Sequence, residues 1–397
     1  MGIVETKFYT FAHPPNELVL DSGQRLGPIT LAYETYGRLN KEKSNAILVF
    51  HALSGDAHAA GKNHPSDSKP GWWDPMIGPG KAFDTDKYFV ICANTIGGCK
   101  GSTGPTSNNP LTGRPYGFDF PVFTIRDIVR SQRPLIDHLG IERLLAVTGG
   151  SMGGMETLEW AITYPERVRL SIPIATASAQ SAQNIAFNEM ARRAIMADPR
   201  WRKGEYYGRE PPVDGLVVAR MIGHITYLSD ETLTKKFGRR LQNGDNFRFG
   251  FDPEFQVESY LRNKGEAFTK RFDANSFFYI TRAIDYFDLS KEYGSLERAI
   301  ERTRSRFLLL SFTSDWLYPS SKSEEILSAL RRCGKQAVHV TVNSTYGHDA
   351  FLIEDEKMAP IISGALDDAY SSNQDVVTPS SLQFTIGSSK TTGKGKD

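Results

Sequence analysis

The feature that most constrains this chain is a glycine-rich stretch at 148–155 with the sequence TGGSMGGM. An apolar run of strand length, 144–147, precedes it, and a helical pattern follows. The spacing Gly149-x-Ser151-x-Gly153 predicts a strand–turn–helix with the serine on a sharp turn, where glycine is needed because side chains do not fit. The N-terminus of a helix favours a developing oxyanion, so Ser151 is the candidate nucleophile.

A more ordinary interpretation of this stretch stays open at this point. Glycine-rich loops between a strand and a helix are common, and their serine then only caps the helix. A serine hydroxyl is a weak nucleophile that needs a base within hydrogen-bond reach and a third group to orient that base. The rest of the chain therefore decides between a catalytic turn and a simple cap.

Strand-like and helical patterns alternate along most of the chain. Short antiparallel strands are expected before residue 37, separated by turn residues such as Pro, Asn, Asp and Gly. Helical periodicity occupies 125–139 and 323–333. This order predicts an α/β fold with a mostly parallel sheet and right-handed crossovers. The buried strands are expected at 46–50, 88–93, 144–148, 171–175, 307–312 and 337–342.

Residues 179–300 interrupt the alternation. They are rich in charge and in helical patterns, notably at 185–197, 217–228 and 277–287. We therefore expect a helical cap or lid inserted into the α/β core. The predicted parts are a first part of the core at 1–178, the cap at 179–300, a second part of the core at 301–370, and a polar tail at 371–397 that is expected to be disordered.

Charge and cysteine content narrow the possible partners and compartment. Lys plus Arg is 47 and Asp plus Glu is 46, so the net charge of +1 suggests neither a nucleic-acid nor a membrane surface. We see no secretory signal and no apolar run of transmembrane length. Three cysteines argue against a disulfide scaffold and fit a reducing cytoplasm.

Two loops after predicted strands can supply the partners of Ser151. In α/β-hydrolases the acid and then the histidine follow the serine in the chain, each on a loop after a strand. Asp315 follows the run at 307–312, and His348 follows the run at 337–342 and a glycine. Each residue also has an ordinary interpretation when it is considered alone. Asp315 would then cap a following turn, and His348 would be a core or surface residue. Their joint type, order and place predict the triad Ser151, Asp315 and His348.

An oxyanion hole needs two backbone N–H donors. We expect one from Met152, which follows the nucleophile, and the other from Leu53, in the loop after the run at 46–50. His51, Asp56 and His58 lie in or near that loop, but their spacing matches no strong metal pattern, so no metal is expected. No Walker A or dinucleotide fingerprint occurs, and no bound cofactor is expected.

Several long motifs carry a resemblance to a known family over roughly residues 5–370. They are Ala32–Gly37, His51–His58, Gly71–Asp74, Ile77–Gly80, Asn94–Pro105, Gly149–Met155, Gln183–Asn188, Gly223–Ser229, Arg271–Asn275 and Gly347–Asp349. With these motifs the chain resembles the homoserine O-acetyltransferases of the α/β-hydrolase fold. The resemblance implies ping-pong transfer, in which a serine takes acetyl from acetyl-CoA and passes it to the hydroxyl of L-homoserine. The product is O-acetyl-L-homoserine, for methionine biosynthesis.

The resemblance also implies the residues that hold the amino-acid substrate. It places Arg220 at the homoserine carboxylate and Asp349 at the ammonium, with Tyr227 nearby. The planar fork of arginine pairs bidentately with a carboxylate. Arg220 and Tyr227 are two helical turns apart and share a face. A solvated helix residue and a helix cap are the ordinary alternatives for Arg220 and Asp349.

The acyl donor and the acceptor are less narrowly predicted. In a related class that uses succinyl-CoA, an arginine tends to follow the Asp-Trp pair, and here Leu317 stands at that place. This favours acetyl. A homoserine or serine O-succinyltransferase, or an esterase with the same triad, remain the alternatives. The family also implies a homodimer with cap helices at the interface.

Overall fold

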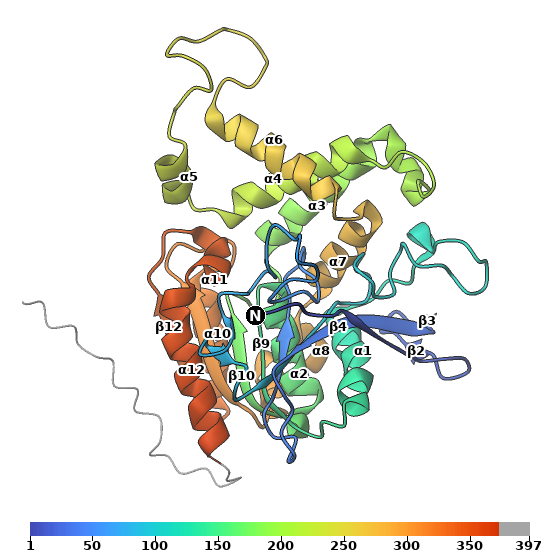
Figure 1. Ribbon diagram of the computed structural model, residues 1–397, viewed down its shortest axis with the longest axis vertical. Coiled ribbons are helices and arrows are strands. Elements are labelled where there is room, and N and C mark those ends of the chain that lie inside the picture. Colours follow the sequence, from blue (N-terminus) through green and yellow to red (C-terminus); the bar gives the residue numbers. More distant parts are fainter. Residues whose placement is uncertain (373–397) are drawn as a thin grey trace, which may run out of the picture.

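A central sheet of eight strands organises the molecule in the computed structural model, which describes residues 1–372 (Figure 1). The first three strands in sheet order, β1, β4 and β8, pair antiparallel, and every pair from β8 onward is parallel. This is the mostly parallel sheet that the sequence predicts. The sheet order is β1 (Lys7–Phe11), β4 (Ile29–Tyr36), β8 (Phe89–Ala93), β5 (Ala46–Phe50), β9 (Leu144–Gly150), β10 (Val168–Ile174), β11 (Arg306–Phe312) and β12 (Ala337–Val342).

The central strands are apolar on both faces because helices cover both sides of the sheet. Along β11, Phe307 and Leu309 belong to one core cluster, and Leu308 and Leu310 belong to another, following the two-residue period of a strand. Helices α1, α2 and α10 contribute to the first cluster, and α12 contributes to the second. These helices are α1 (Ile125–His138), α2 (Met152–Thr163), α10 (Ser320–Arg332) and α12 (Asp355–Ser371).

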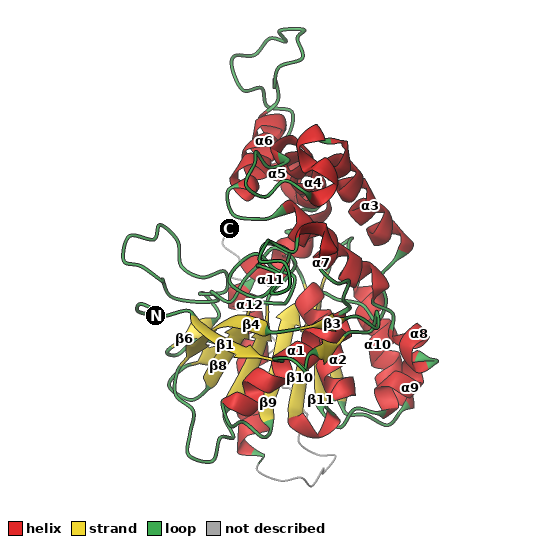
Figure 2. Cartoon of the chain, turned by 90° about the vertical axis from the view of Figure 1, so that its right-hand side faces the viewer, coloured by secondary structure: helices red, strands yellow, loops and turns green. Residues whose placement is uncertain are grey.

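A group of helices stands over one end of the sheet, as Figure 2 shows. Side chains that accept hydrogen bonds from the first turn define where several of them begin, for example Ser181 before α3 and Asp273 before α7. These helices are α3 (Ala182–Ala197), α4 (Val213–Tyr227), α5 (Asp230–Lys236), α6 (Gln256–Thr269) and α7 (Ala274–Tyr286). We call α3 to α7 the cap.

Shorter elements complete the described chain. Helix α9 packs against α10 of the core. Two small ladders, β2 with β3 and β6 with β7, lie outside the main sheet. The remaining bounds are β2 (Leu18–Val19), β3 (Arg25–Leu26), β6 (Ile77–Gly78), β7 (Phe83–Asp84), α8 (Leu289–Tyr293), α9 (Leu296–Glu301) and α11 (Ala350–Ile353).

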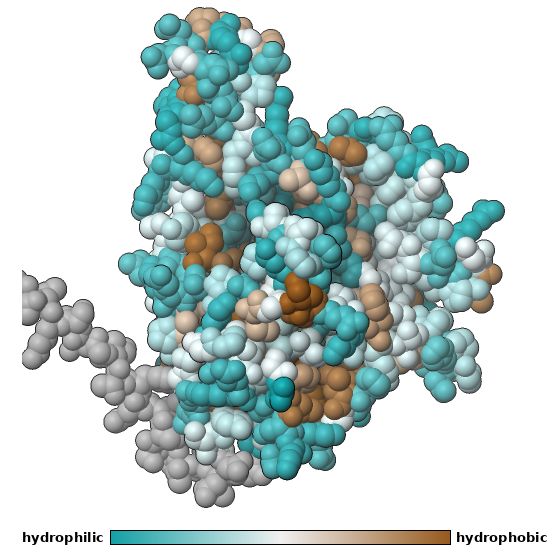
Figure 3. All heavy atoms as spheres, in the orientation of Figure 1, coloured by the Kyte–Doolittle hydropathy of each residue, from teal (hydrophilic) through white to brown (hydrophobic). Residues whose placement is uncertain are grey.

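The surface in Figure 3 is mostly hydrophilic on the face shown, with apolar residues in small separate groups. Within residues 1–372, no helix is both long and apolar enough to cross a membrane. The predicted polar tail at 371–397 lies, apart from its first two residues, outside the described part of the chain.

Candidate active site

Ser151 sits between the end of β9 and the start of α2, in the turn that the glycine spacing predicts. Its φ of 60° and ψ of −119° are a conformation that residues other than glycine rarely adopt, and such strain is typical of functional turns. A Cβ on Gly149 or Gly153 would lie 2.6 or 2.5 Å from the carbonyl oxygen of Phe50. Both glycines are therefore required because the end of β5 passes directly against the turn.

Asp315 and His348 form a buried pair. The distance from His348 Nδ1 to Asp315 Oδ2 is 2.8 Å, and each residue is only 3% exposed. Asp315 Oδ1 accepts hydrogen bonds from the backbone N–H groups of Leu317 and Tyr318, at 3.0 and 2.9 Å. With the carboxylate fixed in this way, a proton on Nδ1 is held by Asp315 and Nε2 is left for another partner.

Shared neighbours bring His348 to the serine turn. Tyr227 and Tyr318 line a pocket together with Ser151, and their rings lie 6.0 and 5.2 Å from the ring of His348. The ring of Phe351 lies 5.5 Å from His348, and a Cβ on the residue before Ser151 would collide with it. Within residues 1–372 no hydrogen bond joins Ser151 Oγ to His348. Hydrogen bonds between a catalytic serine and its histidine often form fully only when substrate is bound.

The two predicted oxyanion donors lie near Ser151 and have unbonded backbone N–H groups. Met152 is the first residue of α2, and Leu53 lines the pocket beside Ser151. Neither backbone N–H donates a hydrogen bond among the described residues. The loop that carries Leu53 is tied to the cap, because the Ser54 carbonyl accepts a hydrogen bond from Arg271 at 2.8 Å.

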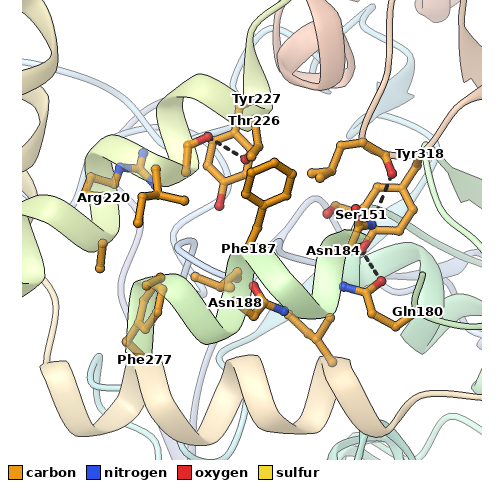
Figure 4. A pocket seen from close by; sticks show the side chains of 17 residues that line it. Ser151, Gln180, Asn184, Phe187, Asn188, Arg220, Thr226, Tyr227, Phe277 and Tyr318 are labelled. Carbon is orange, nitrogen blue, oxygen red and sulfur yellow. Dashed lines mark hydrogen bonds between the residues drawn. The ribbon is translucent and has the colours of Figure 1, made fainter. Parts of the chain in front are cut away.

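The pocket lies between the serine turn, the cap and the loop after β11 (Figure 4). One face of α3 contributes Asn184, Phe187 and Asn188, which recur at helical spacing. The wall is mainly apolar with a few polar side chains, as is usual for small-molecule sites. The lining residues are Leu53, Ser151, Gln180, Asn184, Phe187, Asn188, Ala191, Ala219, Arg220, Ile222, Gly223, Thr226, Tyr227, Phe277, Ile284, Leu317 and Tyr318.

Arg220 lines this pocket from α4. Its guanidinium lies 5.7 Å from the ring centre of Tyr227 and 4.7 Å from that of Phe268, and its Nη1 is 3.4 Å from Ser54 Oγ. It forms no ion pair with any described residue. A partly buried arginine without a carboxylate partner is suited to a bound anion.

Asp349 does not line the pocket but lies beside it, next to His348. Its carboxylate accepts no hydrogen bond within residues 1–372. Burial raises the pKa of Asp349, while the nearby His348 and Arg220 act to lower it. The structure therefore brings Ser151, Leu53, Arg220 and Tyr227 to one pocket and leaves Asp349 at its edge.

One part of the site was missed from the sequence, namely what holds the loop after β5. Glu34 is fully buried and accepts hydrogen bonds from His58 Nδ1 at 2.9 Å and from the hydroxyl of Tyr36 at 2.8 Å. His58, considered above as a metal ligand, is thus bound to a carboxylate that sequence spacing does not connect to it. The pocket asparagines were also unassigned, although they lie within the quoted motif Gln183–Asn188.

The sequence matches a family model and many known proteins over most of its length. A family model described as alpha/beta hydrolase fold matches residues 45–355, which confirms the predicted fold class. The chain is 54% identical over 372 residues to a homoserine O-acetyltransferase from Solidesulfovibrio magneticus, covering 93% of this chain and 94% of the relative. It is 55% identical over 381 residues to one from Methanohalobium evestigatum, covering 95% and 77%.

Solved structures agree in fold but differ in their names. A homoserine O-acetyltransferase from Bacillus anthracis matches with a TM-score of 0.87 and 33% identity, over 92% of this chain and 98% of that one. A structure named esterase E22 matches with a TM-score of 0.85 and 32% identity, over 92% and 100%. Backbone shape alone therefore does not separate the two names, whereas the sequence relatives are identical to this chain at more than half of the aligned positions. The chain belongs to the homoserine O-acetyltransferase family of the α/β hydrolase fold.

Proposed function

We propose that this protein transfers an acetyl group from acetyl-CoA to the hydroxyl of L-homoserine through an acyl-enzyme on Ser151. The product, O-acetyl-L-homoserine, would enter methionine biosynthesis. The observation that carries the proposal is the unpaired Arg220 in the same pocket as the strained serine, in a chain of this family. Water needs no carboxylate-binding cation, but an amino-acid acceptor does.

In the first half-reaction, His348 Nε2 takes the proton of Ser151 while Oγ attacks the thioester carbonyl. Negative charge develops on the carbonyl oxygen, where the Leu53 and Met152 N–H groups donate to it. The tetrahedral intermediate then collapses, the C–S bond breaks, and His348 gives its proton to the leaving thiolate. Asp315 keeps the imidazole oriented and stabilises its charged form.

In the second half-reaction, the homoserine hydroxyl attacks the acyl-serine carbonyl and His348 takes the hydroxyl proton. Collapse of this intermediate breaks the bond to Ser151 Oγ, which regains its proton from His348. Arg220 binds the carboxylate of homoserine, and Asp349 accepts hydrogen bonds from its ammonium, with Tyr227 nearby. The unbonded carboxylate of Asp349 and the electrostatic influence of Arg220 on both other residues support this arrangement.

The lining of the pocket favours acetyl over succinyl. Leu317, at the place where a cation would meet the extra carboxylate of a succinyl group, lines the pocket with an apolar side chain. Its backbone is held on both sides, because its N–H donates to Asp315 and its carbonyl accepts from Asn184.

The test is a purified-protein assay that follows release of free CoA from acetyl-CoA. We expect release beyond the first turnover to depend on L-homoserine. Parallel reactions with L-serine as acceptor and succinyl-CoA as donor should be much slower. No homoserine-dependent release would refute the proposal.

A simple esterase is the second candidate, because esterase E22 resembles this chain over almost its whole length. The two candidates differ in their need for Arg220. An Arg220→Ala variant should lose homoserine affinity by roughly 100-fold if the guanidinium binds the carboxylate. Hydrolysis of p-nitrophenyl acetate by the same variant should stay near the wild-type rate. An esterase would show fast hydrolysis with no homoserine dependence.

We also propose a cytoplasmic homodimer. Three free cysteines among residues 1–372 fit a reducing compartment. Light scattering on the purified full chain measures the mass in solution, and a monomer would contradict the dimer.

A further inference from the structure

A group of cations without carboxylate partners extends from the pocket to the outer surface of the cap. Arg220 and Arg271 flank the ring of Phe268, at 4.7 and 5.1 Å from its centre. Further out, Lys236 and Lys264 lie 4.7 and 5.6 Å from the ring centre of Tyr260.

None of these four cations forms an ion pair within residues 1–372. Other arginines of the cap do, as in Arg192 with Asp285 at 2.7 Å.

The outer cations are connected to the pocket by a row of rings. The hydroxyl oxygen of Tyr260 is 3.4 Å from Nδ1 of His224. The ring centre of His224 is in turn 6.3 Å from the ring centre of Tyr227 in the pocket wall. Burial, and then the positive charges of Arg220 and Lys264, lower the pKa of His224 to about 3. His224 is therefore neutral, and it adds no charge to the group.

A third lysine reaches the same region from the core. Burial, and then the charges of Lys236 and Lys69, lower the pKa of Lys264, and Asp349 acts in the opposite direction. Lys69 belongs to a loop of the α/β core, whereas the other two lysines belong to α5 and α6. The charges of two exposed lysines, Lys236 of the cap and Lys69 of the core, thus act on the exposed Lys264, and repulsion of this kind favours a bound polyanion. We call Lys69, Lys236 and Lys264 the rim lysines.

We propose that the rim lysines bind the phosphate groups of the acyl donor. This inference rests on the proposed function, because it assigns a site to the part of acetyl-CoA that does not react. The homoserine carboxylate needs a single cation, and Arg220 already supplies it inside the pocket. A diphosphate and a ribose phosphate present several charges, which match mobile ammonium groups at an exposed rim. The pantetheine arm would then run past His224 and Tyr227 toward Ser151.

The test compares two thioester donors in a double variant. Lys236→Ala/Lys264→Ala should raise the KM for acetyl-CoA about tenfold or more at low salt, with kcat at saturation near the wild-type value. With S-acetyl-N-acetylcysteamine, which has no phosphate, the KM of variant and wild type should agree. Raised ionic strength should weaken acetyl-CoA binding in the wild type more than in the variant.

The matched control is Lys235→Ala/Lys270→Ala, which also removes two exposed lysines. Lys235 precedes Lys236 in α5, and Lys270 follows the last residue of α6. It should leave the KM for acetyl-CoA within about twofold of wild type. An unchanged KM in the rim variant, or an equal change with both donors, would overturn the inference while leaving the transferase function intact.

Calorimetric titration with CoA itself separates the inference from the function. If the wild type does not use acetyl-CoA but binds CoA more tightly than the Lys236→Ala/Lys264→Ala variant, the proposed reaction fails and the phosphate site stands. If the wild type binds no CoA, both fail.

Discussion

At the scale of single residues, two neighbouring carboxylates around His348 have different surroundings. The Asp315 carboxylate accepts two hydrogen bonds from backbone N–H groups and one from Nδ1 of the His348 imidazole. Burial raises the pKa of Asp349, and its carboxylate accepts no hydrogen bond among the described residues. A carboxylate that is fully bonded to the protein orients a base, whereas one with free acceptor sites can bind a ligand. The two aspartates are thus a matched pair for testing the division of labour.

We predict that Asp315→Asn lowers kcat by about 10³-fold to 10⁴-fold, because the imidazole loses the partner that fixes its tautomer. The KM for homoserine should change little. Asp349→Asn should instead raise the KM for homoserine by roughly tenfold or more, with a smaller effect on kcat. Steady-state kinetics with both substrates varied measures kcat and the KM for homoserine of each variant. The opposite pattern would exchange the two assignments.

At the scale of elements, the serine turn depends on how closely β5, β9 and α2 approach one another. Gly153 lies in the first turn of α2, against the last residue of β5. We predict that Gly153→Ala destabilises the protein by roughly 2 kcal/mol or more, because backbone must move to admit the methyl group. It should also lower kcat, because Ser151 and the N–H of Met152 shift together.

Urea unfolding and acyl-transfer kinetics measure these effects. The control is Gly250→Ala, where a Cβ meets nothing within 4 Å, and it should be neutral in both measurements. A Gly153→Ala variant of wild-type stability and activity would show that the close approach is not required.

Much of the architecture is predictable from local patterns. The apolar runs that predicted strands at 46–50 and 337–342 match β5 and β12, and the turn at Ser151 follows from its glycines. Helices α5, α6 and α12 were not expected. The apolar residues of α6 recur at helical spacing, as in Val257, Tyr260, Leu261 and Phe268, so its period was overlooked among the many charged residues of the cap, and α4 supplies much of its packing.

The candidate site divides in the same way. The order and spacing of the predicted triad and of the predicted donors Leu53 and Met152 follow from rules about strand ends. The structure pairs Asp315 with His348 and places Ser151 and Leu53 in one pocket. Glu34 with His58, and Arg271 with Ser54, join segments far apart in the chain. No sequence period reports such contacts, because they depend on the folded arrangement of loops.

At the scale of the whole molecule, a buried acid couples stability to pH. Glu156 of α2 is 1% exposed and accepts a hydrogen bond from Gln132 at 2.7 Å. Burial raises its pKa from 4.5 to about 8. Between these values the folded protein holds a proton that the unfolded chain has lost, so stability falls as pH rises through this window.

We predict that Glu156→Gln weakens this pH dependence and stabilises the protein at pH 8 by roughly 1–3 kcal/mol. Part of the dependence should remain, because burial also raises the pKa values of Glu159 and Glu292. Urea unfolding from pH 5 to 8 measures it. Glu142→Gln is the control, because that side chain is exposed, and it should leave the stability curve of the wild type unchanged. A wild-type curve that rises over this pH range would contradict the protonated state of Glu156.

Cap and core meet at the pocket, so the proposed reaction would depend on both parts of the molecule. The core contributes Ser151, Asp315 and His348, and the cap contributes Arg220 and Tyr227. A covered pocket would protect an acyl-serine from water until the second substrate arrives. We expect this acyl-serine to form with acetyl-CoA alone and to persist until homoserine binds.

Intact-mass and peptide mass spectrometry after brief incubation with acetyl-CoA alone would detect the acyl-serine. The protein should carry one acetyl group on the peptide that contains Ser151, and a Ser151→Ala variant should carry none there. Addition of L-homoserine should remove the acetyl group and yield an equal amount of O-acetyl-L-homoserine. An unmodified Ser151 while homoserine is acetylated, or an acetyl group that stays on Ser151 when homoserine is present, would rule out the acyl-serine as the intermediate.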